Sequence, residues 1–393
     1  MTLAIDAEEH AARRARLLEH CAAAGLAGYV LSDPDYVRYF FGFAYLFTER
    51  PVLVAQSTAG EQMVFVPGFE VDRVREETRF ERVVSYPEYP GLEHPIHALA
   101  RALAELGVRG ALGADNDGYP GVLGYTGPAL STVTGATVAP LGEVIEAMLM
   151  RKSPAEIALL RESGRWCAYA HGLLQEYSVP GASEAEAGLR AGHEATLAML
   201  AEHGETGGLG SADIVKAGYR GQIGRRSAWA HAVGHNIRFR PGDVLVSETG
   251  APFHGYNAEL ERAMVIGTPN AEQRRLFEYM LDARQAALDA LRPGATCAEV
   301  DGAVMRHLDE HGLRGYWQQH TGHAVGLRNH EAPFLDIGDH TVIEPGMVFT
   351  IEPGIYDPAV GGFRHSDTVA VTEHGIDLLT DYPVELDALV IAA

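Results

Sequence analysis

The sequence predicts an α+β protein in which an N-terminal α/β domain precedes a C-terminal domain of helices segregated from antiparallel strands. Three observations support this fold class. The 393 residues suit two or three domains. In the first half, short apolar runs bounded by glycine, proline or aspartate alternate with helical stretches. In the second half, long helices and returning strands follow a basic, proline-containing segment at 149–154, where we expect the domain boundary.

The N-terminal domain is expected to span residues 1–150. It begins with a helix from Glu8 to Ala24, whose apolar face includes two leucines and a cysteine, and Gly25 ends this helix. The later elements are predicted as strands at 28–31, 51–55, 63–67 and 110–113 and as a helix at 97–106. Strands that alternate with helices indicate an α/β arrangement.

The C-terminal domain is expected to span residues 151–393, beginning with a strongly helical stretch at 155–177. Thr296 and Glu299 stand at the spacing of a capping box, in which each side chain bonds to the backbone N–H of the other residue, and they predict the start of another helix. The other predicted elements are a helix at 271–291 and strands at 243–247, 263–267, 347–351 and 368–371.

A glycine-dense stretch lies between Gly204 and Gly224. Such glycines can cradle a phosphate, but no strand precedes this stretch and no Gly-Lys-Ser follows it. We therefore predict a loop beside a cleft. Because the region also carries Arg220, Arg225 and Arg226, we expect it to influence the choice of substrate.

The composition excludes several classes of partner. A formal net charge of -22 would repel a phosphate backbone, so nucleic acid is not expected to bind. The three isolated cysteines form neither a disulfide framework nor a zinc ribbon and suit a reducing compartment. The N-terminus is charged rather than apolar, and no apolar run approaches the roughly 18 residues of a membrane span. We therefore expect a cytoplasmic protein without a membrane partner.

Histidine and glutamate gather in segments of the second half that lie at strand ends or beside glycines. Glycine lets a backbone approach a ligand closely, so such places suit a site. The segments are 230–236 (AHAVGHN), 248–262, 320–331 (HTGHAVGLRNHE) and 352–367. The run His365, Ser366 and Asp367 has the composition of a hydrolase triad, but neighbours on a strand point to opposite sides, so the histidine cannot act as base for the serine.

Together these segments resemble the creatinase, aminopeptidase P and prolidase superfamily, whose C-terminal domain has the pita-bread fold. The matching motifs are GDVLVSETG, GYNAELER, TGHAVG with HEAP, IEPGMVFTIEPGIY and FRHSD. The N-terminal half resembles the family more loosely, at Asp33 to Phe43 and in the joint from Met150 to Arg161. The resemblance implies a creatinase-like N-terminal α/β domain followed by a pita-bread catalytic domain.

The resemblance also implies a metal site with substituted ligands. Its ligands would be Glu248, Glu259, His323 and Glu352, and Ser366 stands where the peptidases have a final glutamate that bridges two ions. A serine hydroxyl is a poor ligand for a hard divalent ion, so a standard dinuclear site is not expected. The cofactor is then either one divalent ion, of manganese, iron, cobalt or zinc, or none.

The catalytic assignments follow from the same resemblance. His231 matches a histidine that assists proton transfer, and His330 matches one that steadies the substrate carbonyl, while Glu352 would help to protonate the leaving nitrogen. Creatinase, which works without metal and binds a cationic guanidinium with glutamates, has the same Leu-Glu-Arg at 260–262. Glu261 is therefore a candidate substrate-binding residue. His365 is another, and Arg364 is expected either to anchor a substrate carboxylate or to pair with a neighbouring acid.

We expect a hydrolase that splits a carbon-nitrogen bond in a small amino-acid derivative or short peptide, with a mononuclear or metal-free site. One alternative is an Xaa-Pro dipeptidase or aminopeptidase with ordinary metal dependence. Others are a metal-dependent lyase acting on a cationic substrate and a catalytically dead binding module, although several clustered ionisable groups argue against the latter. The resemblance further implies a homodimer.

Overall fold

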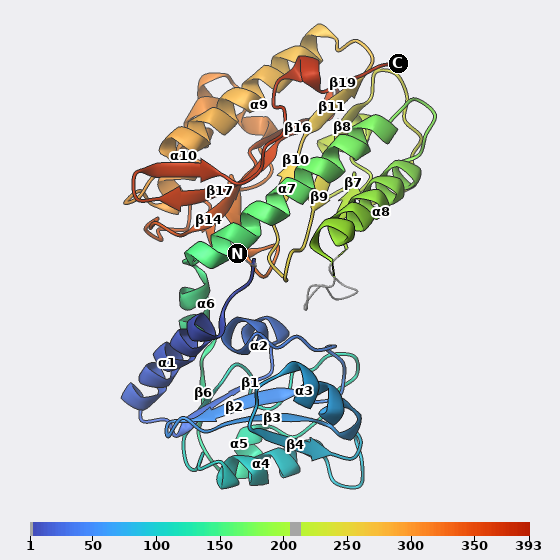
Figure 1. Ribbon diagram of the computed structural model, residues 1–393. Helices are drawn as coiled ribbons and strands as arrows, with labels where there is room; N and C mark the ends of the chain where they lie inside the picture. The colour runs from blue at the N-terminus through green and yellow to red at the C-terminus, as the bar shows by residue number, and fades with distance from the viewer. Residues whose placement is uncertain (1–2, 205–213) are drawn as a thin grey trace. The chain divides into compact units, whose positions relative to one another are not determined.

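The computed structural model describes residues 3–204 and 214–393. The chain divides into two compact units. One consists of Ile5–Met148, and the other consists of Leu149–Ala393 together with the start of the chain up to Ala4. Both units contain helices and strands, as Figure 1 shows. Each is described here by itself.

The N-terminal unit is built on a mixed sheet with the strand order β4-β3-β2-β1-β5-β6. Strands β1 and β2 and strands β2 and β3 pair antiparallel, whereas the outer pairs are parallel. The strands are β1 (Gly28–Leu31), β2 (Leu53–Ser57), β3 (Gln62–Pro67), β4 (Arg82–Tyr86), β5 (Leu112–Ala114) and β6 (Val138–Pro140). The helices are α1 (Ala7–Ala23), α2 (Pro34–Phe41), α3 (Val71–Glu77), α4 (Pro95–Glu105), α5 (Leu130–Thr134) and α6 (Gly142–Leu149).

The C-terminal unit contains a larger sheet with the order β13-β12-β14-β17-β10-β9-β7, to which β18 adds beside β17. Its strands are β7 (Lys216–Gly218), β9 (Glu248–Gly250), β10 (Glu259–Glu261), β12 (Gly322–Ala324), β13 (Glu331–Leu335), β14 (Val348–Ile351), β17 (Ser366–Thr372) and β18 (Gly375–Leu378). Smaller sheets are formed by β8 (Val244–Val246), β11 (Ala263–Ile266) and β19 (Val390–Ile391), and by β15 (Gly354–Asp357) and β16 (Gly361–Arg364).

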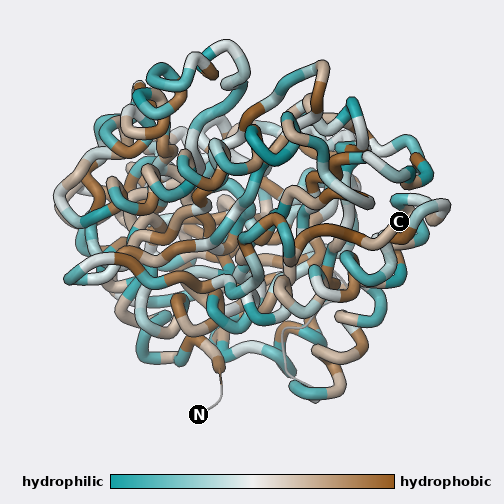
Figure 2. The backbone as a smooth tube through the Cα atoms, turned by 90° about the horizontal axis from the view of Figure 1, so that it is seen from above, coloured by the Kyte–Doolittle hydropathy of each residue, from teal (hydrophilic) through white to brown (hydrophobic). Residues whose placement is uncertain are grey.

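Four long helices accompany these sheets in the described part of the C-terminal unit. They are α7 (Pro154–Tyr177), α8 (Glu184–His203), α9 (Ala271–Ala290) and α10 (Cys297–Glu310). The capping box predicted at Thr296 and Glu299 is confirmed, and Ser153 and Ser183 start α7 and α8 in the same way. Figure 2 shows hydrophobic residues along the strands and a mixture of hydrophilic and hydrophobic residues along the helices. This distribution places the core between helices and sheet.

Several elements of the C-terminal unit were absent from the sequence-based prediction, among them helix α8 and strands β7, β10, β12 and β13. Helix α8 was not predicted, because its many alanines and glycines give it little apolar periodicity. The expected loop at 204–224 contains strand β7, which pairs antiparallel with β9, and its residues 205–213 lie outside the described part of the chain. A three-residue strand of Lys, Ala and Gly carries too weak a pattern to be recognised in a sequence.

Helix α8 lies unusually close to the edge strand β7. A Cβ atom added to Gly188 would come within 2.6 Å of the carbonyl oxygen of Ala217, and one added to Gly192 within 2.7 Å of that of Val215. These distances are too short for any larger residue without movement of backbone. The two glycines therefore permit the contact between helix and strand.

A buried ionic network supports the sheet on the side opposite the candidate site. Arg262 and Arg284 each place a guanidinium nitrogen 2.8 Å from a different carboxylate oxygen of Asp367. Arg262 also donates to the backbone oxygens of Pro383, Tyr382 and Ser366. Because neighbouring residues of a strand point to opposite sides, Asp367 faces this network while Ser366 faces the other side of β17.

Within the described residues, no helix is both long enough and apolar enough to cross a membrane.

We expect Gly188→Ala to lower the free energy of unfolding of the C-terminal unit by about 1 to 2 kcal/mol, because the new methyl group collides with backbone. The matched control is Gly172→Ala in α7, where an added Cβ meets nothing within 4 Å and should stabilise the unit by about 0.5 to 1 kcal/mol. All three tryptophans, Trp166, Trp229 and Trp317, lie in this unit, so urea unfolding followed by tryptophan fluorescence measures both changes. If both substitutions changed the free energy of unfolding by the same amount, the close contact between α8 and β7 would be contradicted.

Candidate metal and catalytic site

Glu259, His323 and Glu352 form a cluster in the centre of the large sheet. Each offers one ligand atom, and these atoms all lie within 4.8 Å of one another. The residues come from β10, from β12 and from the end of β14, and these strands are linked through β17 in the order of the sheet. Strand pairing therefore brings together residues that are up to 93 positions apart, as the difference between 352 and 259 shows.

The imidazole of His323 is oriented for binding through Nε2. Its Nδ1 lies 3.1 Å from the carbonyl oxygen of Ala324, and because a carbonyl oxygen only accepts, Nδ1 carries the proton of this hydrogen bond. Nε2 lies 3.3 Å from Oε1 of Glu352. A ring held in this way by its second nitrogen has the arrangement that metal-binding histidines usually show.

Burial and mutual repulsion alter the protonation of the cluster. Burial, followed by the charges of Glu352 and Glu261, raises the pKa of Glu259 to about 8. Burial acts against the charged form of His323, but the hydrogen bond and charge of Glu352 outweigh it and raise the pKa of His323 to about 9. Burial likewise opposes ionisation of Glu352, yet His323 and then Arg364 hold its pKa below the ordinary value. A nearby cation is thus needed before the carboxylates of Glu259, Glu261 and Glu352 can all be ionised at the same time.

The donor set of this cluster fits one divalent transition-metal ion. Two carboxylate oxygens and one imidazole nitrogen are ligands that zinc, manganese, iron and cobalt accept. Three protein ligands leave further coordination positions free, which is the arrangement of catalytic sites. The Oγ of Ser366 donates to Oε1 of Glu259 at 2.8 Å, so this serine contacts a ligand carboxylate and adds no charge of its own.

The structure does not bring Glu248 into this cluster, although the sequence predicted it as a ligand. Arg220 Nε lies 2.5 Å from Glu248 Oε2 and therefore pairs with its carboxylate. The same guanidinium lies 3.6 Å from Oε1 of Glu261. Glu248 stays a predicted ligand, and in this structure its carboxylate is paired with an arginine.

Arg364 and His365 are both buried and have contacts within the protein, and pairing with an acid was one of the two roles expected for Arg364. Arg364 is buried and pairs with Glu261 through two nitrogens, with Nη2 2.6 Å from Oε1 and Nε bonded to Oε2. His365 is fully buried, receives a hydrogen bond from the backbone N–H of Ala263 and lies 3.1 Å from the carbonyl oxygen of Val384. Burial, together with the charge of Arg262, lowers the pKa of His365 to about 3. Its position does not support a contact with substrate, and Glu261 is engaged by arginine.

His330 lies against the cluster at its exposed side. Its ring stacks on that of His323, with centroids 3.9 Å apart and an angle of 15° between the planes. Burial and the charge of His323 lower the pKa of His330, and His231 lies near enough to contribute in the same direction. The next residue, Glu331, forms a buried ion pair with Lys152 at 2.6 Å. This pair anchors the segment that presents His330.

The segment that carries His231 is held mainly through backbone contacts. Arg364 lies 3.4 Å from the carbonyl oxygen of Ala230, and Gln222 lies 3.3 Å from that of Trp229. The buried carboxylate of Glu184 accepts hydrogen bonds from the backbone N–H groups of Gly221, His235 and Ile237, at 2.8, 2.7 and 3.1 Å. Glu184 thereby joins the turn of Arg220 to the segment of His231.

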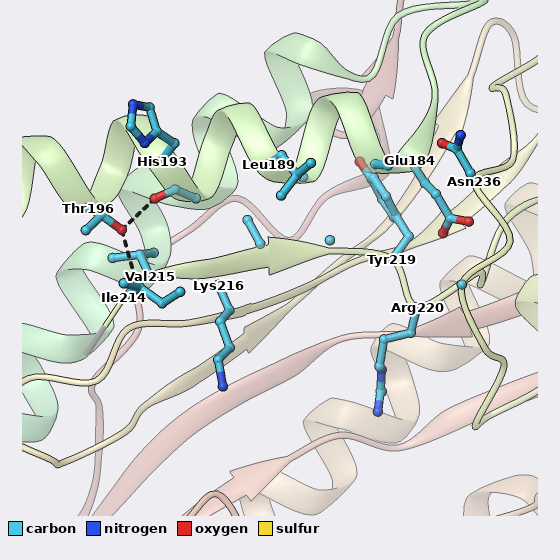
Figure 3. A pocket seen from close by; sticks show the side chains of 16 residues that line it. Glu184, Leu189, His193, Thr196, Ile214, Val215, Lys216, Tyr219, Arg220 and Asn236 are labelled. Atoms are coloured by element: carbon cyan, nitrogen blue, oxygen red, sulfur yellow. Dashed lines mark hydrogen bonds between the residues drawn. The ribbon is translucent and has the colours of Figure 1, made fainter. Parts of the chain in front are cut away.

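A cavity of about 670 Å³ lies along α8 and β7 and reaches from His193 and Thr196 to Glu184 and Arg220. Figure 3 shows the side chains that line it. Its lining is mostly apolar, and none of the metal-cluster residues contributes to it. Arg220 therefore borders both the cavity and the carboxylates of the candidate site.

Sequence reasoning did not identify Glu184, Lys152 or Glu331 as parts of the site. The adjacent Ser183 and Glu186 form a recognisable capping box, but nothing in the sequence says that Glu184 turns inward toward distant loops. Glu331 belongs to the HEAP motif, whereas its partner Lys152 lies 179 residues away. Such partners are visible only after folding.

Comparison with known proteins relates these residues to a family. Residues 158–373 match metallopeptidase family M24, and residues 13–148 match the creatinase/prolidase N-terminal domain. The chain is 30% identical over 383 residues to the probable dipeptidase PepE of Mycobacterium bovis, covering 97% of both chains. It is 42% identical over 163 residues to the Xaa-Pro dipeptidase of Pyrococcus furiosus, an alignment that covers 42% of this chain and only 47% of that relative.

The same likeness appears among solved structures. An Xaa-Pro dipeptidase from Bacillus anthracis superimposes with a TM-score of 0.80 at 25% identity, covering 97% of this chain and 99% of that one. These matches confirm the predicted fold class, with a creatinase-type N-terminal α/β domain and a C-terminal pita-bread domain.

We expect Glu184→Ala to lower the free energy of unfolding by about 2 to 4 kcal/mol, because three backbone donors lose a charged acceptor. Amide hydrogen exchange should accelerate at Gly221, His235 and Ile237 in particular. Glu202→Ala, which removes an exposed carboxylate from the same helix, should change stability by less than about 1 kcal/mol. Unchanged exchange at these three amides in Glu184→Ala would show that the carboxylate does not hold the segments.

Proposed function

The chain belongs to metallopeptidase family M24 and is a hydrolase of the peptidase class, and from this premise we propose that it cleaves Xaa-Pro dipeptides. The observation that carries the proposal is the cluster of Glu259, His323 and Glu352, with ligand atoms within 4.8 Å of one another and His330 stacked beside it. The printed names of the relatives, Xaa-Pro dipeptidase and probable dipeptidase, support this class of substrate.

We propose that Glu259, His323 and Glu352 hold one divalent ion. When bound, such an ion supplies Lewis-acid chemistry, by which carbonyl groups are polarised and water is activated at neutral pH. The chain itself supplies two carboxylates and an imidazole, whose Nδ1 proton is already bonded to Ala324 and whose Nε2 would lose its proton on binding the ion. The hydrogen bond from Ser366 orients the carboxylate of Glu259.

His330 and His231 would perform the remaining steps. Because burial and His323 lower its pKa, His330 is neutral at pH 7 and can donate one ring N–H to the oxygen of a peptide carbonyl as negative charge develops there. His231 is exposed at the same side of the site, in a segment held by Arg364, Gln222 and Glu184. An exposed imidazole can exchange protons with solvent and deliver one to the leaving nitrogen.

A second candidate function is hydrolysis of a carbon-nitrogen bond in a guanidino or ureido compound, as in creatinase. Specific observations favour it. Glu248 and Glu261 already bind guanidinium groups, those of Arg220 and Arg364, so this part of the site is chemically suited to such a cation. Ser366 also supplies no carboxylate. The expected homodimer and cytoplasmic location stay predictions.

Assays with the two classes of substrate distinguish the two candidate functions. We expect hydrolysis of Xaa-Pro dipeptides in the presence of manganese, cobalt or zinc, loss of activity after chelation, and recovery when the ion is returned. Released proline is measured by chromatography. Guanidino and ureido compounds serve as the comparison and should remain intact; hydrolysis of these compounds alone, with or without metal, would establish the second candidate instead.

His231→Ala should reduce kcat by about 100- to 10,000-fold, which is the usual contribution of a positioned acid or base. His235→Ala is the matched control, since it removes an exposed imidazole from the same segment while its backbone N–H still bonds to Glu184. Circular dichroism and the number of bound ions should be unchanged in both variants. If both variants keep full activity on the dipeptides, the role of His231 as proton carrier is wrong.

A further inference from the structure

Arg220 is directed toward the carboxylates of the site by a tightly held turn. Strand β7 pairs with β9 so that Gly218 lies opposite Glu248, and Arg220 follows two residues later. Its backbone has a positive φ of 47°, which residues other than glycine rarely adopt, and Gly221 follows with a φ of 75°. The N–H of Gly221 is bound by Glu184. A constrained backbone of this kind commonly marks a functional position.

The charges around Arg220 divide the site into two halves. In the first, Glu259 and Glu352 would present two negative charges and His323 a neutral ring nitrogen once one divalent ion is bound, and that ion balances the two charges. In the second, Glu248 and Glu261 present two more. Arg220 contacts both of these carboxylates, and Arg364 pairs with Glu261 through two nitrogens. Two arginines therefore balance the two carboxylates of the second half.

Ser366 separates the two halves chemically. It lies opposite Glu261 in the pairing of β10 with β17, and its hydroxyl donates to Glu259. A carboxylate at this point could reach an ion on either side, whereas a hydroxyl brings no charge to hold two cations together. With Arg220 in place and no carboxylate at position 366, the donors around Glu248 and Glu261 do not fit a second ion, although those of the first half fit one.

We propose that Arg220 is a built-in cation that occupies the Glu248 and Glu261 half of the site and limits the chain to a single divalent ion. The inference rests on the proposed function for the location of that ion, at Glu259, His323 and Glu352. Arg220 acts as a positioning and charge-balancing residue. Its side chain is 43% exposed, so it also meets any substrate that enters from that side.

Counting bound ions tests the inference without any substrate. Mn²⁺ is titrated into metal-free full-length protein by calorimetry, and its electron paramagnetic resonance spectrum is recorded. Wild type should bind one ion per chain and give the six-line spectrum of an isolated Mn²⁺ ion. Arg220→Ala should bind a second ion at least tenfold more tightly than wild type does. Arg220→Ala combined with Ser366→Glu should bind two ions and show the exchange-coupled spectrum of a pair.

Two matched variants test whether the positive charge of residue 220 limits the number of bound ions. Arg220→Lys keeps the positive charge and should bind one ion, as wild type does. Arg225→Ala removes an equal charge from an exposed position of the same segment and should also bind one. Because Arg220 already has a positive φ, alanine introduces no new backbone strain there, and thermal unfolding verifies that each variant folds. If Arg220→Lys and Arg220→Ala bind the same number of ions with the same affinity, the inference is overturned, because the charge at position 220 would then not determine how many ions bind.

The remaining outcomes separate this inference from the proposed function. His323→Ala should abolish binding of the single ion; if it does not, the proposed location of the metal is wrong. If wild type binds two ions, the proposed role of Arg220 is wrong. It is also wrong if wild type and every Arg220 variant bind the same number of ions with the same affinity. Neither result depends on whether Xaa-Pro dipeptides are cleaved.

Discussion

The carboxylates of Glu259, Glu261 and Glu352 share one region of a buried sheet, and removing charges from water is costly unless opposite charge is supplied nearby. Arg364 is committed to Glu261, and His323 bonds to Glu352. Glu259 is left with a hydrogen bond from Ser366 and a raised pKa. At neutral pH the raised pKa lets Glu259 hold a proton, and a cation bound there would let it ionise, in line with the single ion proposed above.

Several contacts that shape this site lie outside it. Glu184 holds the turn of Arg220 and the segment of His231 through backbone N–H groups, and the buried pair of Lys152 and Glu331 anchors the segment of His330. Helix α8, which carries Glu184, can lie close to β7 because Gly188 has no side chain. Packing of one helix thus sets the positions of groups proposed to move protons. Support from residues outside a site is expected where the side chains of that site must keep fixed positions.

Much of the site could be predicted from the sequence because the order of the motifs shared with a known family can be recognised without coordinates. Glu259 and Glu261 were assigned to the site through the family resemblance, and the structure places both on β10, where residues two apart face the same side. Glu259, His323 and Glu352 were named as ligands, and the structure places their ligand atoms together. Glu248 and His365 were named for the site as well. The structure instead pairs Glu248 with Arg220 and buries His365 among backbone partners.

The sequence by itself determined the fold class, the family motifs and the replacement of a carboxylate by Ser366, because these depend on residue type and local order. Only the tertiary structure decided which charges neutralise one another. Arg220 reaches Glu248 across paired strands, and Lys152 reaches Glu331 over 179 residues. Ion pairing depends on distances of a few ångströms between side chains, and a linear sequence does not contain such distances.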